Sequence, residues 1–332
     1  MSERAFTDLV DLAAERLGGA VLLANDEFFA PKEALLHSSA PQWREAEYTE
    51  RGKWMDGWET RRRRSPGHDW CLVRLGLAGI VRGAVVDTSF FRGNYPEACE
   101  LEGAEVEGVP DPTALASDLS VRWHPLVKRS PLAGDTRNMF DVTCAERLSH
   151  VRFRIFPDGG VARLRLHGEV RPAASAFAAG RVLDVAAIEH GGYVVACSDM
   201  FFGHRQNLIM PGRSTHMGDG WETRRRRGPG HDWSLVRLAL RANVQRVELD
   251  TDHFKGNAPG SCSLDYCDAP GANEVSLQAL VQWRPLLPET PLQPHARHAW
   301  ELPAEIVATH VRLNIFPDGG VARLRVLGSH AA

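Results

Sequence analysis

Alternating apolar and polar residues mark the most regular segments of the chain. Residues 151–156 alternate apolar side chains with arginines, and residues 161–166 alternate again after the turn sequence Pro-Asp-Gly-Gly. A period of two is typical of a half-buried strand, and the short glycine-containing loop predicts that the two strands pair as a hairpin. Residues 311–316 and 321–326 carry the same pattern. We therefore expect one such hairpin in each half of the chain.

Strand patterns dominate elsewhere, and helix patterns are sparse. Residues 7–17 place apolar side chains at helical spacing and stop at a Gly-Gly pair, which predicts a helix. A second short helix would be capped by Asp26 and run to Leu36, with Asp199 as the counterpart of the cap in the second half. Many short strands without βαβ alternation predict an all-β protein of antiparallel β-sandwiches. Further strands are expected at residues 71–77, 80–87 and 120–127, and at residues 234–240, 244–250 and 275–286.

Most motifs of the chain occur twice. DGWETRRRR occupies residues 56–64 and 219–227, a GHDW block follows each copy, and both halves close on IFPDGGVARLR. The separation of roughly 160 residues is far longer than the period of roughly 20–50 residues in solenoid proteins. We therefore predict two homologous domains, residues 1–170 and residues 171–332. Residues 171–180, which are rich in small side chains and unmatched in the first half, are expected to form the linker.

Composition narrows the functional class. A length of 332 residues is enough for two domains that each bury a core, and the formal net charge of −3 is unlike that of a nucleic-acid-binding protein. No apolar run approaches the roughly 20 residues that span a bilayer. Acidic residues near the N-terminus argue against a targeting peptide, and six cysteines without a duplicated framework are typical of reduced thiols. We expect a cytoplasmic protein that binds neither nucleic acid nor membrane.

The sequence contains no standard motif that identifies a catalytic mechanism. The sequence contains no GxSxG elbow, no HExxH, no CxxC pair and no phosphate-binding glycine loop. It contains instead a duplicated set of polar residues, part of which lies in loops that follow predicted strands, where sandwiches commonly carry binding groups. Metal binding by His, Asp and Glu is conceivable, but the spacing matches no standard set, and no cofactor is expected. The set comprises Glu59 and Glu222 in the WETRRRR blocks, His68 and His231 in the GHDW blocks, and Asp87 and Asp250 at the ends of predicted strands.

The arginine runs and the histidines each allow two interpretations. The runs at residues 61–64 and 224–227 would be solvated faces, or one or two of their members would form a bidentate clamp on a carboxylate. His68 would be a general acid or base, or a buried histidine satisfied by the backbone. Adjacent side chains on a strand point to opposite faces, so we do not expect His68 to touch Asp69.

One loop differs between the two copies at a position that matters for proton transfer. The second copy reads Asp-Thr-Asp-His from Asp250, whereas the first reads Asp-Thr-Ser-Phe from Asp87, so His253 stands opposite Phe90. A phenyl ring cannot transfer protons, whereas an imidazole titrates near neutrality. If His253 carries chemistry, the two copies have different roles at this loop.

In combination, these blocks resemble the allantoicase family over nearly the full length of the chain. The resemblance rests on NDEFFAP at residues 25–31, the two GWETRRRR and GHDW blocks, DTDHFKGN at residues 250–257 and the two IFPDGGVARLR segments. It implies two tandem jelly-roll β-sandwich domains, similar to galactose-binding-like domains, that assemble as homo-oligomers. It further implies hydrolysis of allantoate to ureidoglycolate and urea in the breakdown of allantoin.

The chemistry of that reaction fits the residue types that recur. Releasing urea from allantoate cleaves a C–N bond at an sp³ carbon, which needs neither an acyl-enzyme nor an oxyanion hole. The site must hold the carboxylate, protonate the leaving nitrogen and guide a water molecule. The expected acid–base candidates are His253, Glu222, His231, Glu59 and His68. The expected substrate-binding candidates are Arg61, Arg62, Arg224, Arg225, Asp87, Asp250, Lys255 and Asn257.

Two other functions are compatible with these residues. One is hydrolysis of a related ureido compound, such as ureidoglycolate or allantoin. The other is a non-catalytic sandwich that binds carbohydrate or another ligand, because fold alone does not determine function. A lectin would be expected to carry a signal peptide and aromatic loops, whereas the matched loops here carry charged residues.

Overall fold

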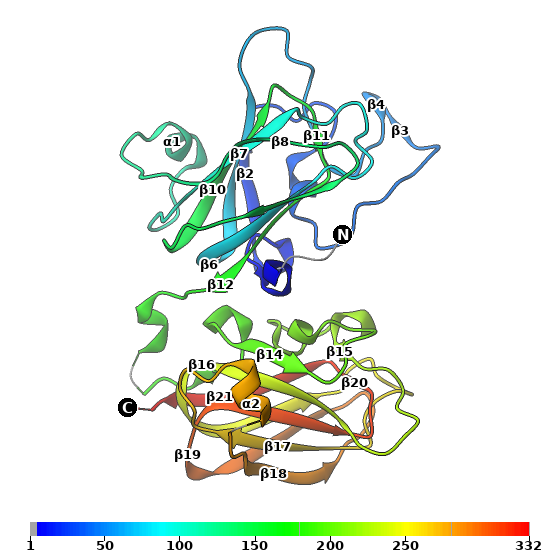
Figure 1. Cartoon of the computed structure of the whole chain (residues 1–332), viewed down its shortest axis with the longest axis vertical. Helices are drawn as coiled ribbons and strands as arrows, with labels where there is room; N and C mark the ends of the chain where they lie inside the picture. The colour runs from blue at the N-terminus through cyan, green and yellow to red at the C-terminus, as the bar shows by residue number, and fades with distance from the viewer. Residues whose placement is uncertain (1–4, 179, 280, 332) are drawn as a thin grey trace. The chain divides into compact units, whose positions relative to one another are not determined.

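The chain folds into two compact units of β-structure. The computed structural model describes residues 5–178, 180–279 and 281–331. Its internal contacts divide the chain into Met1–Arg171 and Pro172–Ala332, which we call the first and second unit (Figure 1). Each unit is an antiparallel jelly-roll β-sandwich, which confirms the predicted fold class.

A single long strand connects the two layers of the first unit. Strand β6 (Asp69–Asp87) has 19 residues. Its first half pairs with β10 (Leu148–Phe156) and its second half with β12 (Arg163–Val170), and the start of β10 and the end of β12 both reach Gly79. The short connection from β10 to β12 therefore brings both ends of β6 to one end of the sandwich. We call this the motif end, because the duplicated sequence blocks surround it.

The other strands of the first unit extend these two layers. In one layer, β2 pairs with the first half of β6, and β7 and β8 follow β10. In the other layer, β1 pairs with β12, and β9 pairs with the second half of β6. The remaining elements are β1 (Val10–Asp11), β2 (Ala20–Ala24), β3 (Tyr48–Thr49), β4 (Gly52–Lys53), β5 (Trp58–Glu59), β7 (Ala98–Ala104), α1 (Pro112–Ser117), β8 (His124–Pro131), β9 (Arg137–Asp141), β11 (Gly160–Val161) and short 3₁₀ turns at Ala5–Asp8, Glu15–Leu17 and Lys32–Leu36.

The second unit repeats this plan. Strand β16 (Asp232–Asp250) corresponds to β6, and β21 (Arg323–His330) corresponds to β12. Strand β19 (Arg297–Phe316) pairs with both halves of β16, so it joins the counterparts of β9 and β10 in one strand. The remaining elements are β13 (Leu183–Asp184), β14 (Tyr193–Cys197), β15 (Trp221–Glu222), β17 (Ser261–Cys267), α2 (Glu274–Ala279), β18 (Arg284–Pro291), β20 (Gly320–Val321) and 3₁₀ turns at Ala174–Phe177, Ile188–His190, Arg205–Ile209 and Met217–Asp219.

Equivalent tryptophans anchor the loops at the two motif ends. Trp58 and Trp221 are fully buried, and each indole N–H donates to a backbone carbonyl, that of Asp26 at 2.8 Å or that of Asp199 at 2.9 Å. A buried aromatic ring of this size costs about 3–5 kcal/mol when truncated to alanine. The tryptophan of each WETRRRR block therefore fixes the position of the loop that carries the catalytic candidates.

Equivalent buried arginines hold the same loops from the other layer. Arg163 of β12 has an Nη2–Oδ2 distance of 2.8 Å to Asp56, and Arg323 of β21 has one of 3.0 Å to Asp219. Both guanidinium groups also donate to backbone carbonyls. A charge buried in this way is stable only when it is paired and hydrogen-bonded.

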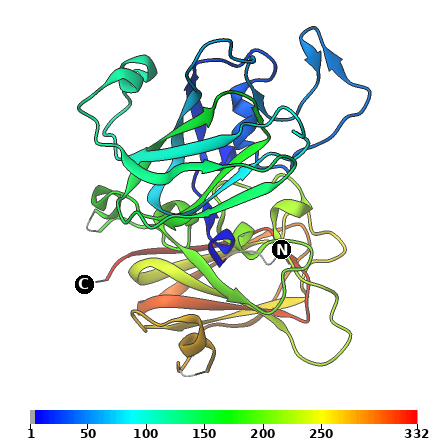
Figure 2. The same ribbon diagram turned by 45° about the horizontal axis from the view of Figure 1, so that its top comes forward.

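The first unit has an additional hairpin. Strands β3 and β4 pair with each other and extend away from the sandwich (Figure 2). The Trp43 ring, which lies in the segment before β3, is 5.9 Å from the ring of Phe90, and the Lys53 ammonium lies 4.7 Å from the Trp43 ring centre. The hairpin segment is thus attached to the loop in which the two copies differ.

The predicted hairpins around FPDGG are wrong. Strands β10 and β12 each pair with β6, and β11 between them pairs with β5. The alternating pattern correctly indicates strands, but the segment between them crosses from one layer to the other. For the same reason, residues 71–77 and 80–87 form the single strand β6, and residues 234–240 and 244–250 form β16.

Several other predicted elements also need correction. Residues 7–17 form 3₁₀ turns and strand β1, because Val10 pairs with Gly168 of β12 instead of continuing a helix. The strand predicted at 120–127 begins at His124. The strand predicted at 275–286 consists of helix α2 and the start of β18, and residue 280 lies outside the described residues. The short turn that ends at Leu36 begins after Pro31, without a side-chain cap from Asp26.

Candidate active site

The topology gathers the duplicated motifs at the motif end of each unit. In the first unit, β5 pairs with β11, so Glu59 lies opposite Gly160 of the FPDGG segment. The Gly160 N–H donates to the Asn94 carbonyl at 2.7 Å, which brings the loop after β6 to the same place. The second unit has the same contacts, with Glu222 opposite Gly320 and the Gly320 N–H on the Asn257 carbonyl.

A glutamate and an asparagine pair at each motif end. Asn94 Nδ2 donates to Glu59 Oε1 at 2.7 Å, and Asn257 Nδ2 donates to Glu222 Oε1 at 2.6 Å. Burial raises the pKa of the Glu59 carboxyl, against the opposing effect of the hydrogen bond from Asn94. Of the predicted residues, Glu222 and Asn257 are thus in direct contact.

The two aspartates that end the long strands organise their own loops. Asp87 Oδ1 accepts from the backbone N–H of Ser89 at 2.9 Å and from its hydroxyl at 2.6 Å. Asp250 Oδ1 accepts from the backbone N–H of Asp252 at 2.8 Å. Both carboxylates are buried. These hydrogen bonds shape the loops that follow, and the substrate-binding role of both aspartates stays a prediction.

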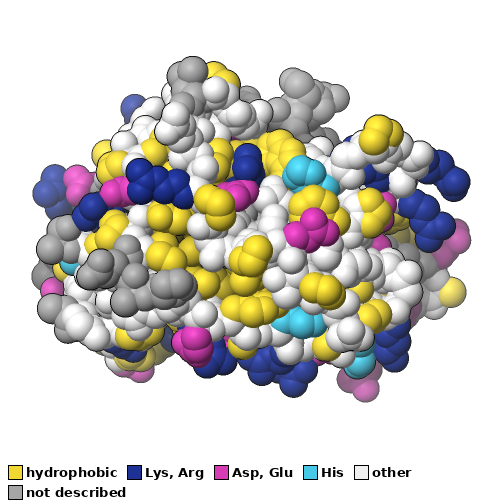
Figure 3. All heavy atoms as spheres, turned by 90° about the horizontal axis from the view of Figure 1, so that it is seen from below, with side chains coloured by type: hydrophobic (Ala, Val, Ile, Leu, Met, Phe, Trp, Pro, Cys, Tyr) yellow, Lys and Arg dark blue, Asp and Glu magenta, His cyan; other side chains and the backbone are white. Residues whose placement is uncertain are grey.

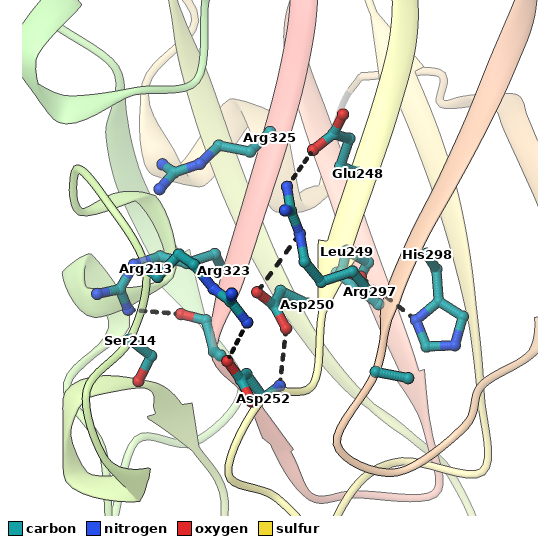
Figure 4. A network of polar contacts seen from close by, with 12 residues as sticks. Arg213, Ser214, Glu248, Leu249, Asp250, Asp252, Arg297, His298, Arg323 and Arg325 are labelled. Atoms are coloured by element: carbon teal, nitrogen blue, oxygen red, sulfur yellow. Dashed lines mark hydrogen bonds and ion pairs between the residues drawn. The ribbon is translucent and has the colours of Figure 1, made fainter.

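The second unit carries two histidines around a buried carboxylate. We call this group the His253 cluster, and it comprises Arg213, Ser214, Asp252, His253 and His295. Asp252 accepts from Arg213 Nη2 at 2.7 Å and lies 2.8 Å from His295 Nδ1. His253 Nε2 lies 3.0 Å from the Ser214 carbonyl and 4.0 Å from Asp252 Oδ2. Figure 4 shows Asp252 beside Arg213 and next to Asp250.

Two contacts of the His253 cluster meet at Nδ1 of His295. Burial acts to raise the pKa of Asp252, but the hydrogen bond from Arg213 and the surrounding positive charge lower it overall, so the carboxylate stays ionised. His295 Nδ1 is 2.8 Å from Asp252 Oδ1 and also 2.9 Å from the backbone nitrogen of His253. A proton on Nδ1 satisfies the carboxylate, whereas its loss satisfies the backbone N–H. The ring therefore has a good partner in either state.

The same backbone geometry in the first unit holds different side chains. Phe90 and His253 have φ values of 70° and 69°, and Asp135 and His295 have values of 49° and 50°. Such values are uncommon outside glycine and persist only where the surroundings fix them. In the first unit the Phe90 N–H donates to Asp135 Oδ1 at 2.8 Å. The loop geometry is therefore common to both units, whereas the imidazoles occur in the second.

All four predicted arginines are exposed, and two of them are paired with aspartates. Arg61 Nε donates to Asp26 Oδ2 at 2.7 Å, and Arg224 Nε donates to Asp199 Oδ2 at 3.2 Å. The same carboxylates accept from the backbone N–H of their arginines, so these pairs fix the loop. Three further candidates have exposed side chains, namely Arg62, Arg225 and Lys255.

A recess in the first unit lies over the arginine run. It has a volume of about 320 Å³ and is lined by Arg61, Arg62 and Arg63 together with Asp26 and Asp69. Two of the three arginines are paired with those aspartates, at 2.6 Å in both cases. A carboxylate ligand in this recess would depend on Arg62.

His68 and His231 lie against phenylalanines of the FPDGG segments. Their ring centres are 5.1 Å from Phe156 and 4.7 Å from Phe316. Burial lowers the pKa of His68, and the positive charge of Arg154 lowers it further. Within the described residues no hydrogen bond joins either histidine to the glutamate–asparagine pairs or to the His253 cluster. The structure thus does not bring all predicted acid–base residues into one group.

The side-chain positions also bear on the question of metal binding. Over residues 5–178, 180–279 and 281–331, no group of three or more His, Cys, Asp or Glu side chains is arranged to hold a metal ion.

A sequence model of the allantoicase repeat matches residues 10–171 and 183–331, once in each unit. The chain belongs to the allantoicase family. The allantoicase of Dictyostelium discoideum is 44% identical over 325 residues, which cover 96% of this chain and 87% of that protein. A probable allantoicase of Pseudomonas aeruginosa is 45% identical over 98% of this chain and 97% of its own length.

Solved allantoicase structures share the fold. One matches with a TM-score of 0.81 at 33% identity, over 97% of this chain and 93% of that chain. The allantoicase of Saccharomyces cerevisiae matches with a TM-score of 0.78 at 32% identity, over 96% of this chain and 92% of that chain. The arrangement of two tandem sandwiches is therefore that of allantoicases.

Three members of the His253 cluster, Arg213, Ser214 and His295, were not predicted from the sequence of this allantoicase repeat. Arg213 lies in an irregular connection, and His295 lies in the loop between β18 and β19. A signal for His295 does exist in the sequence, because its counterpart in the first repeat is Asp135, just as Phe90 is the counterpart of His253. Comparing the two allantoicase repeats for positions at which histidine replaces another residue would identify both histidines.

Proposed function

We propose that the protein is an allantoicase, a hydrolase that converts allantoate and water to ureidoglycolate and urea. The observation that carries this proposal is the 44% identity to the Dictyostelium discoideum allantoicase over 96% of the chain. The fold match to solved allantoicases and the absence of nucleophile motifs both agree with it. This reaction is a step in the breakdown of allantoin.

We place the reaction at the motif end of the second unit. The Glu222 carboxylate there accepts an N–H from the Asn257 amide at 2.6 Å. A ureido group presents the same NH₂ and C=O as that amide, so Glu222 and Asn257 are suited to hold one. The exposed Lys255 and Arg225, together with Arg224, supply positive charge for the substrate carboxylate.

The His253 cluster supplies the proton transfers in this proposal. An imidazolium of the cluster gives its proton to the leaving ureido nitrogen as the C–N bond breaks, and urea departs. The remaining ureido nitrogen donates its electron pair to the central carbon. Water then adds to that carbon and loses a proton to the neutral imidazole. Asp252 keeps the imidazoles oriented and stabilises their charged form.

The first unit contributes binding without proton transfer in this proposal. It keeps the equivalent glutamate–asparagine pair, Glu59 with Asn94, and the exposed Arg62. At the positions of the two histidines it carries Phe90 and Asp135. Its candidates Glu59, Arg61, Arg62, His68 and Asp87, and His231 of the second unit, are therefore expected to affect turnover less than His253.

The location, partners and assembly of the enzyme are inferred from its helices, cysteines and charge. No helix in the described parts of the chain is long and apolar enough to cross a membrane. All six cysteines are free thiols, which supports a cytoplasmic location. On the face drawn in Figure 3, Lys and Arg side chains lie among acidic, apolar and other side chains. The formal net charge of −3 favours a small-molecule partner over nucleic acid. We further propose a homo-oligomer, which light scattering of the purified protein would test.

The decisive experiment is incubation of the purified chain with allantoate. Urea is measured colorimetrically, and ureidoglycolate is identified by NMR at matching amounts. Allantoin and ureidoglycolate serve as alternative substrates and should release no urea. A folded preparation that releases no urea from allantoate near neutral pH, with or without added divalent metal, would refute the proposal.

A further inference from the structure

A cavity of about 510 Å³ lies in the second unit beside helix α2. Its lining includes the rings of His231, Trp233 and Phe316 and the polar side chains of Ser263, Arg312 and Asn314. Ligand pockets typically have volumes of about 300–1,000 Å³ and combine an apolar lining with a few convergent polar groups. Neither the His253 cluster nor the Glu222–Asn257 pair lines it.

The cavity results from a difference between the two units at one cross-strand pair. Ser263 of β17 lies opposite Asn314 of β19, and Glu100 of β7 lies opposite Arg154 of β10 in the same place of the first unit. Arg154 reaches Glu100 at 3.4 Å and Glu102 at 2.8 Å, so long paired side chains occupy that face. The second unit has two short neutral side chains there, which leaves the space open.

Several polar groups at the cavity have atoms that can still form a hydrogen bond with a ligand. Arg312 binds Asp265 Oδ2 through Nε at 3.0 Å and Nη2 at 2.7 Å, and no contact of its Nη1 lies within hydrogen-bond reach among the described residues. Asn314 is buried, and its Oδ1 has no hydrogen-bond partner in the described structure. The ring nitrogens of His231 likewise have no hydrogen-bond partner there. The buried Asn314 Oδ1 is unfavourable without a partner, and a ligand N–H would satisfy it.

We propose that this cavity is a second small-molecule site, separate from the reaction site, for a planar ring that carries a carboxylate. The ring fits against Trp233 and the packed pair of His231 and Phe316, since aromatic rings pack favourably in offset or edge-to-face contact. The carboxylate fits at the guanidinium of Arg312, which the Trp283 ring supports from behind at 5.1 Å. A ring N–H or carbonyl would meet the side chains of Asn314 and Ser263.

The test uses the full chain and orotate, a planar ring with a carboxylate and ring N–H groups. Binding is measured by calorimetry and by saturation-transfer NMR. Uracil, which lacks the carboxylate, and cyclohexanecarboxylate, which lacks the flat ring, are the matched ligands. We expect saturable binding of orotate and at least about tenfold weaker binding of each control.

Matched variants locate the site. The double variant Ser263→Glu with Asn314→Arg installs the ion pair of the first unit and should weaken orotate binding at least about tenfold. Ser263→Leu obstructs the cavity without charge and should weaken it similarly, which covers a failure of the double variant to fold. The converse change in the first unit, Glu100→Ser with Arg154→Asn, should leave the affinity at the second-unit cavity unchanged.

Three results would overturn the proposal. One is that the wild-type chain binds none of the three ligands. Another is that orotate binding persists unchanged in both folded second-unit variants. The third is that these variants lose urea release from allantoate along with orotate binding, because the cavity would then be the reaction site. Retained urea release with lost orotate binding supports two separate sites, and the urea assay of the wild type tests the proposed function independently.

Discussion

Replacing His253 with asparagine tests the proposed catalytic group most directly. The side chain is 32% exposed, and within the described residues its hydrogen bond joins Nε2 to the Ser214 carbonyl at 3.0 Å. Losing such a bond costs about 0.5–1.5 kcal/mol. Asparagine also tolerates the φ of 69° at this position better than most residues. The free energy of unfolding should therefore fall by no more than about 1.5 kcal/mol, a shift of roughly 3–6 °C in Tm for a unit of this size.

The effect on turnover should be far larger than the effect on stability. A general acid or base contributes about 10²–10⁴-fold to the rate, so kcat/KM for allantoate should fall at least about a hundredfold. The matched control is Phe90→Asn, which makes the same replacement at a φ of 70° in the first unit. It removes the ring contact with Trp43 and should lower Tm while kcat/KM stays within about threefold of wild type.

The assay is initial-rate urea release at several pH values, with thermal melting of each variant in the same buffer. A folded His253→Asn variant with kcat/KM within threefold of wild type would refute the assignment and move the chemistry to Glu222 or the GHDW histidines. Equal losses in His253→Asn and Phe90→Asn would show instead that the loop geometry, and not the imidazole, is what turnover requires.

Four further outcomes follow from the contacts. The pKa of Asp252 is lowered in the folded state, so the ionised carboxylate stabilises the fold above its unfolded pKa. This stabilisation is lost as the pH falls through the folded pKa, and the Tm difference between wild type and Asp252→Asn should therefore shrink between pH 6 and pH 3. Burial raises the pKa of Glu59, so its ionisation opposes folding as pH rises, and Glu59→Gln should raise Tm more at pH 7 than at pH 4. Arg163→Met leaves the Asp56 carboxylate without its buried partner and should cost about 3–5 kcal/mol in urea-induced unfolding. Burial raises the pKa of Cys99 to about 12, so a thiol reagent should modify it only when the chain unfolds.

Local patterning predicts the strands but not their partners. The alternation in residues 151–156 and 161–166 reflects a real inside and outside face, and both segments are strands in the structure. Hairpin pairing was the wrong inference because strand propensity says nothing about which neighbour supplies the hydrogen bonds. Residues 7–17 show the converse, since pairing of Val10 with Gly168 overrides a helical spacing of apolar side chains. Which strands pair is determined by the packing of the complete sandwich and not by the local sequence.

Part of the candidate site was predictable as residues, whereas its contacts and the partners Arg213 and His295 were not. Duplication points to Glu222 and Asn257, and the mismatch between the copies points to His253. Their bonds depend on loops that are distant in the sequence, as with Arg213, which reaches Asp252 at 2.7 Å across 39 residues. Irregular loops have no periodicity to read, so such a partner becomes visible only when the fold brings the segments together.

The shared backbone of Phe90 and His253 has a consequence for how the two units can be altered. Positions with φ of 70° and 49° in the first unit match those with 69° and 50° in the second. The backbone conformation of each loop is therefore independent of the side chains that it carries. Imidazoles placed at Phe90 and Asp135, with a carboxylate at Ser89, would enter a conformation the chain already adopts. Duplication thus gave the first unit the same loop backbone as the second. Side chains can be exchanged at these positions without a change of backbone conformation.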